Sequence, residues 1–361
     1  MRRIQLFEPQ TGARHAGSKA PGDVQAIAAE CGFEAFPMHR LIPPNRLWFP
    51  VMRFCRRLQR RRYASDVPGD SVVFVQFPTS LVGGGFNRPM TELVRRVKET
   101  KRQKVVSLVH DVECIRGKSD PLSLPMSEDL RFWCETADVL IVHNRRMADW
   151  FQRNGVSPER LVPLEIFDYL APGFVRRTDA TERRSVCIAG NLDSAKAGYL
   201  ARLADVTDVR WELYGPNYRS AGRTERIRYH GTVAPERLPE RLEGGFGLVW
   251  DGDSIDSCAG GMGEYLRVNA PHKLSLYLAA GLPVIVWDES AAAVFVREHG
   301  VGFPVRSLRE IGTRIAAISE PNYDRLKRNA GAISAKLRSG HFTKSALAKA
   351  LALVDNTTPR P

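Results

Sequence analysis

Short runs of β-branched residues alternate along this chain with amphipathic stretches of helical length, and the whole alternation occurs twice. A strand followed by a helix and a second strand is typical of a parallel sheet, because the helix carries the chain back to the edge where the next strand starts. The two rounds therefore predict two Rossmann-like α/β domains. The 361 residues suffice for two cores of ordinary size.

The boundary between the two predicted domains lies at a turn-rich segment, 167–173, followed by charged residues as far as Arg184. We expect domains at 1–170 and 171–340, with a C-terminal helix at about 341–356 that packs back onto the first domain. Two such sheets leave a cleft between them, and ligands bind outside the carboxyl ends of the strands. The expected strands are 4–7, 71–77, 104–110, 139–143, 161–166, 185–189, 209–214, 227–230, 246–250, 283–287 and 302–305.

Composition and ends indicate a cytoplasmic protein. The sequence contains no apolar run near the ~20 residues that span a bilayer, and acidic Glu8 interrupts the N-terminus before a signal-peptide core could form. The six cysteines are scattered, which favours reduced thiols over disulfides or zinc ligands. Aromatic residues are not interleaved with the basic patches, so nucleic acid is not an expected partner. Whether the chain forms a homo-oligomer is left open.

Positive charge is concentrated near the N-terminus. The net charge is +13, and residues 39–62 contain eight arginines and no acid. Within 48–62, apolar Val51, Phe54 and Leu58 recur at helical spacing. One interpretation is a basic amphipathic helix that docks on an anionic membrane, which would make the protein peripheral on the inner membrane face. The other is a core-packed helix with a solvated arginine face, and the sequence leaves both open.

The most informative motif is the run 269–283, Asn-Ala-Pro-His-Lys-Leu-Ser-Leu-Tyr-Leu-Ala-Ala-Gly-Leu-Pro. Asn269 is suited to cap a helix, and Pro271 is tolerated in a first turn. The start of such a helix offers free N–H groups with Lys273 beside them, an arrangement that suits a diphosphate. The alternative is an ordinary capped helix with a solvated lysine.

Two further loops follow predicted strands of the second domain. Gly190 permits a tight turn after 185–189, and the turn carries Asn191 and Lys196. The other loop begins Trp250-Asp251-Gly252-Asp253, whose two carboxylates resemble a pair that holds Mn²⁺ in single-sheet glycosyltransferases. We expect no metal here, because this chain predicts two separate sheets.

Several segments resemble the bacterial family of β-1,6-galactofuranosyltransferases and the related glucosyltransferases that extend sugars on serine-rich adhesins. The similarity covers most of 1–310 and is most specific from 245 to 286. The segments that carry it are Leu-Val-His-Asp-Val-Glu at 108–113, Ala-Asp-Val-Leu-Ile-Val-His-Asn at 137–144, Ala-Gly-Asn-Leu at 189–192, Gly-Phe-Gly-Leu-Val-Trp-Asp-Gly at 245–252, and the run 269–286.

The resemblance implies the GT-B fold, in which two facing Rossmann-like domains enclose a cleft. It also implies a UDP-sugar donor held mainly by the second domain, no cofactor and no essential metal. Many retaining GT-B enzymes carry a Glu-x₇-Glu pair that would fall here on Val268 and Leu276, so its absence favours inversion. The expected donor-binding residues are Asn191, Lys196, Trp250, Asp251, Asn269, His272, Lys273 and Ser275.

The acceptor is expected against the first domain, where His110-Asp111 ends an apolar strand. Displacement of UDP needs a base to take the proton of the acceptor hydroxyl. Asp111 is the first candidate, with His110 or Glu113 behind it, although an Asp after a strand is also a common helix cap and His110 could be only a packed ring.

Together these features predict a hexosyltransferase that moves galactofuranose or glucose from a UDP-sugar to a hydroxyl of a glycan or lipid-linked glycan. Two alternatives stay open on the same fold. One is a UDP-sugar epimerase, and the other is a catalytically silent pseudo-glycosyltransferase that serves as a partner subunit.

Overall fold

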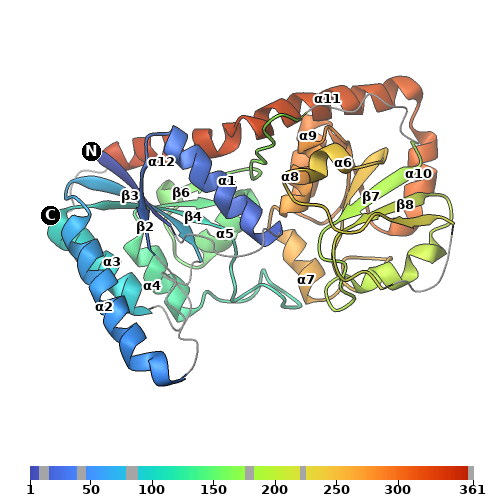
Figure 1. The fold of residues 1–361 in the computed structure, drawn as a ribbon. Helices are drawn as coiled ribbons and strands as arrows, with labels where there is room; N and C mark the ends of the chain where they lie inside the picture. The colour runs from blue at the N-terminus through green and yellow to red at the C-terminus, as the bar shows by residue number, and fades with distance from the viewer. Residues whose placement is uncertain (8–15, 39–45, 79–87, 175–182, 220–224, 357–361) are drawn as a thin grey trace.

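A computed structural model gives the fold of the chain and describes residues 1–7, 16–38, 46–78, 88–174, 183–219 and 225–356. Two six-stranded sheets, both wholly parallel, lie side by side and carry helices on their faces (Figure 1). The fold is therefore GT-B, as the sequence predicts. No helix of the described residues is long and apolar enough to cross a membrane.

The first sheet has the strand order β2-β1-β3-β4-β5-β6. Its central strand β3 is buried along its whole length, which explains its uninterrupted apolar sequence. The strands are β1 (Arg2–Phe7), β2 (Glu34–Pro37), β3 (Ser71–Phe77), β4 (Lys104–Val109), β5 (Val139–Val142) and β6 (Leu161–Pro163). The helices are α1 (Ala16–Glu30), α2 (Phe49–Asp66), α3 (Arg88–Lys101), α4 (Glu128–Thr136) and α5 (Arg145–Arg153).

The second sheet has the order β12-β11-β10-β7-β8-β9. The chain winds outward from β7 in one direction as far as β9 and then returns to β10 on the other side of β7. The strands are β7 (Ser185–Ala189), β8 (Arg210–Tyr214), β9 (Ile227–Tyr229), β10 (Phe246–Val249), β11 (Val284–Trp287) and β12 (Gly302–Val305). The helical elements are the 3₁₀ segments η3 (Gly198–Asp205) and η4 (Tyr265–Arg267), with α6 (Leu238–Arg241), α7 (Gly261–Glu264), α8 (His272–Ala279), α9 (Ala292–His299) and α10 (Ile311–Ala317).

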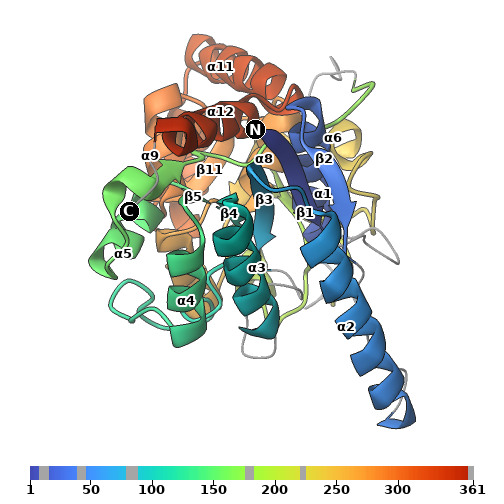
Figure 2. The ribbon, with the colours of Figure 1, turned by 90° about the vertical axis from the view of Figure 1, so that its left-hand side faces the viewer.

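Two C-terminal helices join the halves of the molecule. Helix α11 (Glu320–Arg338) packs on α8 of the second half, and α12 (His341–Asn356) lies against β5, β6 and α1 of the first (Figures 1 and 2). The Asp168 carboxylate accepts hydrogen bonds from the backbone N–H groups of Phe342, at 3.2 Å, and Thr343, at 2.6 Å. The segment 167–173, here called the connecting segment, therefore holds the start of α12 in place.

The structure confirms every predicted strand, most of them to within one residue. Sequence reasoning missed β2, whose residues are mostly exposed and show no apolar alternation. It also missed α4, although Ser127 caps that helix, and α10. Two further glycine-containing loops follow predicted strands, at 83–85 and at Thr11-Gly12. Both lie outside the described residues.

Candidate active site

The order of the second sheet places its ligand-binding edge between β7 and β10, where the winding direction reverses. The loop after β7 begins with Gly190, and the loop after β8 begins with Gly215. A Cβ atom on Gly215 would lie 1.8 Å from the Gly190 carbonyl oxygen, so the two loops pass each other only because position 215 is glycine. This contact fixes the turn that leads to Lys196.

Lys273 lies at this edge in the first turn of α8. Its ammonium donates to the Trp250 carbonyl at 2.9 Å and to the Asp251 carboxylate at 2.8 Å. Both side chains of this ion pair are largely buried. The predicted lysine is therefore paired with Asp251 rather than solvated.

Lys196 comes from the loop after β7 and joins the same group. Burial lowers the pKa of its ammonium, while the charges of Asp251 and Asp111 raise it and those of Lys273 and Arg116 lower it. These neighbours belong to both halves of the molecule. The structure therefore brings the predicted donor-side cations and the predicted base into one charged cluster.

Asp111 follows β4 of the first sheet. Burial raises the pKa of its carboxyl to about 6, against the opposing influence of the Arg116 guanidinium, which lies 3.1 Å away. Tyr265 of the second half also lowers the pKa of this carboxyl. A carboxylate with a pKa just below neutrality is ionised at pH 7 yet basic enough to accept a proton.

Sequence reasoning missed two residues that hold Asp111. Arg116 lies five positions after it in a loop that follows a strand, which is a position where the sequence could have drawn attention to a cation. Tyr265 belongs to η4 of the second half, and its hydroxyl accepts the Val112 N–H of the first half at 2.9 Å. No sequence signal points to Tyr265, because the contact joins residues 153 positions apart.

His110, adjacent to Asp111, has different surroundings. Its ring stacks on Phe167, with ring centres 5.2 Å apart, and Nε2 lies 2.6 Å from the Gln76 amide oxygen. Burial lowers the pKa of His110 to about 3, so the ring is neutral. The structure thus makes His110 a packed imidazole and leaves Asp111 as the ionisable partner.

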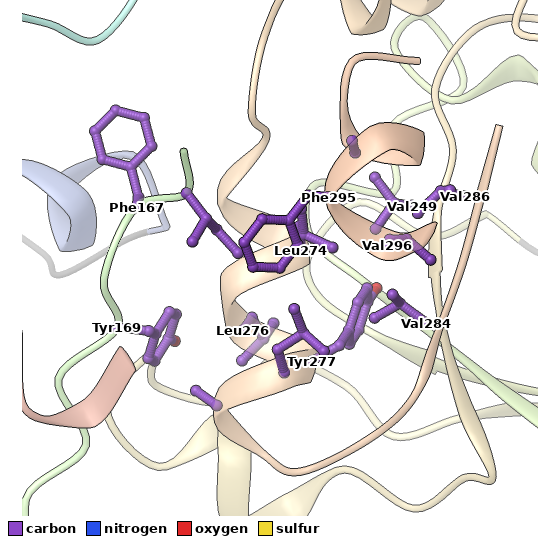
Figure 3. Packing of buried hydrophobic residues seen from close by; sticks show 14 of the residues in the cluster. Phe167, Tyr169, Val249, Leu274, Leu276, Tyr277, Val284, Val286, Phe295 and Val296 are labelled. Carbon is purple, nitrogen blue, oxygen red and sulfur yellow. The ribbon is translucent and has the colours of Figure 1, made fainter. Parts of the chain in front are cut away.

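Two further predicted donor residues also face the connecting segment. His272 stacks on Tyr169, with ring centres 4.9 Å apart, and the Ser275 hydroxyl donates to the Phe167 carbonyl at 2.6 Å. Figure 3 shows Phe167 and Tyr169 on a segment that runs alongside α8. Ser275 is fully buried by this contact, and it is therefore not brought to the charged cluster.

The expected helix cap is wrong. Helix α8 begins at His272 with Pro271 as the N-cap residue, and no side chain caps it. The Asn269 backbone N–H instead bonds to the Tyr265 carbonyl at 3.1 Å, because η4 directly precedes it, and its buried side-chain oxygen has no partner. The Ala270 N–H donates to His143 Nδ1 at 3.0 Å, so this stretch is an interdomain contact.

Trp250 and Asn191 complete the predicted set. The Trp250 ring is fully buried and its indole N–H donates to the Ser254 carbonyl at 2.9 Å, so only its backbone carbonyl faces Lys273. Asn191 is exposed in the loop after β7, where its side-chain oxygen accepts a hydrogen bond from Asn217 at 2.9 Å. Asn191 is thus accessible to a ligand and Trp250 is not.

One group of described residues could place three metal-ligating atoms within 4.8 Å of one another, namely Glu212, His230 and Glu243. It contains none of the predicted site residues. His230 Nε2 already lies 2.6 Å from Glu212, and the His230 ring stacks flat on Tyr214. These contacts are those of an internal hydrogen-bonded cluster on β8.

Comparison with known proteins identifies the family. Residues 4–166 match the glucosyltransferase 3-like N-terminal domain, and residues 186–350 match the glucosyltransferase 3-like C-terminal domain. The chain is 29% identical over 337 residues to the β-1,6-galactofuranosyltransferase WbbI of Escherichia coli, covering 92% of this chain and 94% of that one. It is 27% identical over 249 residues to glucosyltransferase 3 of Streptococcus gordonii, covering 69% and 71% of the two chains.

Among solved structures, the chain resembles Anabaena HepE in complex with UDP, with a TM-score of 0.60, 12% identity, and coverage of 97% of this chain and 99% of the other. At this identity the likeness concerns the fold. The two domain models span nearly the whole described chain, and the charged cluster draws residues from both ranges. The chain therefore belongs to the glucosyltransferase 3-like family and is a hexosyltransferase with the GT-B fold.

Proposed function

We propose that the charged cluster binds a UDP-sugar and transfers its hexose, galactofuranose or glucose, to a hydroxyl of a glycan acceptor. The observation that carries this proposal is that charges from both halves of the molecule, those of Asp111, Asp251 and Lys273, act on the Lys196 ammonium, beside the Lys273–Asp251 ion pair at 2.8 Å. The diphosphate requires cations, and the acceptor hydroxyl requires a base on the opposite side. The relative named as a galactofuranosyltransferase and the HepE complex with UDP support the same donor class.

In the proposed reaction, Asp111 accepts the proton of the acceptor hydroxyl as that oxygen bonds to the anomeric carbon of the donor. The bond from this carbon to the diphosphate breaks, and UDP leaves with the electron pair. Lys196, Lys273 and Arg116 stabilise the charge that develops on the diphosphate. Attack opposite to the leaving group inverts the anomeric configuration.

We further propose that the transfer needs no metal ion. Asp251 is engaged by Lys273 at 2.8 Å, and a cation at Asp251 would have to displace this ammonium. Activity is therefore expected to persist in excess EDTA. If EDTA abolishes the activity and Mn²⁺ restores it, the transfer depends on a metal ion. This result would leave the proposed UDP-sugar donor unchanged.

The acceptor is proposed to be a lipid-linked glycan at the cytoplasmic face of the inner membrane. The arginine-rich segment 48–62 supports this placement, because it suits a surface of anionic lipid.

The test is UDP release from UDP-glucose and UDP-galactofuranose, measured with and without glycan acceptors, followed by NMR of the product linkage. Acceptor-dependent release with an inverted anomeric centre is expected. Isomerised UDP-sugar without acceptor would instead make the protein an epimerase. The absence of turnover and of binding with every donor would overturn the proposal in favour of a silent partner subunit.

A further inference from the structure

Large exposed apolar side chains gather at the N-terminal end of α2. Of the nine such residues in the described part of the chain, six lie between positions 47 and 58. The most exposed of these six are Leu47, at 86%, and Phe54, at 60%. A concentrated patch of this kind marks an interaction surface, whereas single exposed apolar residues do not. The six residues, here called the apolar ridge, are Leu47, Trp48, Phe49, Val51, Phe54 and Leu58.

Helix α2 packs only weakly against the protein core. Tyr63 is its one buried residue, and the helix extends away from the rest of the molecule toward its N-terminal end (Figure 2). The sequence allowed a core-packed helix whose apolar face includes Val51, Phe54 and Leu58. That interpretation is wrong, because all three side chains are at least 45% exposed.

Arginines border the apolar ridge. Helix α2 contains six arginines, and its single acid, Asp66, lies 3.3 Å from Arg62. This leaves five arginines with no carboxylate on the same helix. They include most of the residues that line a hollow of about 560 Å³ beside the ridge, which are Arg53, Phe54, Arg57, Arg60, Arg61, Ala64 and Leu93.

We propose that α2 and the preceding turn dock this protein on a bilayer of anionic phospholipid. The apolar ridge would enter the boundary between head groups and acyl chains, where Trp48 is also well placed. The arginines would contact lipid phosphates, and the hollow is large enough to receive a head group. A helix with both a large exposed apolar face and a dense positive charge fits this surface on both counts.

Charge also argues against a second copy of the chain as the occupant. Two copies meeting through this face in a two-fold arrangement would bring two arginine-rich helices together, each with six arginines and one acid, which is unfavourable. An anionic bilayer supplies the opposite charge. The proposal does not depend on the sugar chemistry, because docking needs no donor or acceptor.

The experiment is cosedimentation of the full chain with vesicles of phosphatidylcholine, either alone or mixed with phosphatidylglycerol. Wild-type protein should bind the mixed vesicles and not the neutral ones. Each basic residue at such a surface contributes about fivefold to partitioning. The triple variant Arg53→Gln, Arg57→Gln and Arg61→Gln should therefore bind about 100-fold more weakly.

A matched control tests whether the position of the charges matters. Arg325→Gln, Arg328→Gln and Lys336→Gln remove the same charge from exposed positions on α11 and should leave vesicle binding within about twofold of wild type. A second α2 variant, Leu47→Ser, Phe54→Ser and Leu58→Ser, should also release the protein from vesicles. Thermal melting of each variant shows that it folds.

Three results would overturn the proposal. The first is wild-type protein that fails to bind the mixed vesicles, and the second is equal loss in the α2 and α11 charge variants. The third is a wild-type dimer that the serine variant converts to monomer without any vesicle binding, which would make a second copy the occupant.

Discussion

The interdomain interface contains two regions of opposite character. The charged cluster contains Asp111, Lys196 and Lys273, and the charges of Asp111 and Lys273 both act on the Lys196 ammonium. The imidazole region lies beside the connecting segment and is formed by three neutral rings. His110 stacks on Phe167, His143 meets Phe167 edge-on, and His272 stacks on Tyr169. The first region contains charged side chains that can bind an anionic ligand. In the second region burial lowers the pKa of each histidine, so the rings are neutral and contribute by packing.

The difference shows how one sequence motif can serve two regions. His272 and Lys273 are adjacent at the start of α8, yet their side chains point about 100° apart around the helix. His272 therefore meets Tyr169, whereas Lys273 meets Asp251. The same division places Asp111 in the charged cluster and its neighbour His110 in the imidazole region. Adjacency in sequence was thus a poor guide to shared function here.

The largest expected effect is on Asp111. Replacing it with Asn removes the base and should lower kcat by about 10²–10⁴-fold. The melting temperature at pH 7 should not fall, because burial disfavours the ionised carboxylate that the variant lacks. Steady-state kinetics and thermal melting together check this. If the variant keeps the wild-type kcat, Asp111 is not the base of the reaction.

In the wild type, kcat/KM should fall below about pH 6, where the Asp111 carboxyl becomes protonated.

Lys273→Ala should weaken UDP binding by roughly 100-fold, because a charge-assisted contact to the diphosphate is lost. It also leaves Asp251 without its partner. The double variant Lys273→Ala, Asp251→Asn separates the two effects. If the double variant recovers wild-type affinity for UDP, Lys273 serves only to neutralise Asp251.

His143 probes the imidazole region. Burial lowers its pKa to about 4 from 6.5, so the folded state binds fewer protons than the unfolded state between these values. The stability this group contributes is full above pH 6.5 and is lost as pH falls toward 4. His143→Asn keeps an acceptor for the Ala270 N–H but does not titrate.

Between pH 7 and about pH 5, wild type should lose about 2 kcal/mol of unfolding free energy relative to His143→Asn. Denaturant titrations at both pH values measure this difference, and the other titrating groups are common to both proteins. If the unfolding free energies of wild type and His143→Asn change in parallel with pH, burial does not keep His143 neutral.

The smallest expected effect belongs to Ser275. Ser275→Ala removes its hydrogen bond to the Phe167 carbonyl and should cost about 1 kcal/mol of stability. The KM for the UDP-sugar should stay unchanged, since the side chain faces the connecting segment. If KM for the UDP-sugar rises while the stability stays the same, Ser275 contacts the donor after all.

The sequence predicted the fold well because buried parallel strands have uninterrupted apolar runs, as in β3 and β7. The exposed edge strand β2 offered no such pattern. Candidate site residues could be named from the sequence where a polar residue follows a strand, as with Asp111 and Lys196. It could not be predicted where the partner comes from the other half of the chain, as with Tyr265.

The most direct test of the division into two regions is a calorimetric titration of UDP into wild type, Lys273→Ala and Ser275→Ala. The account predicts binding to wild type and to Ser275→Ala with similar affinity, and about 100-fold weaker binding to Lys273→Ala. Absence of UDP binding to the wild type at millimolar concentration, or equal loss in both variants, would contradict it.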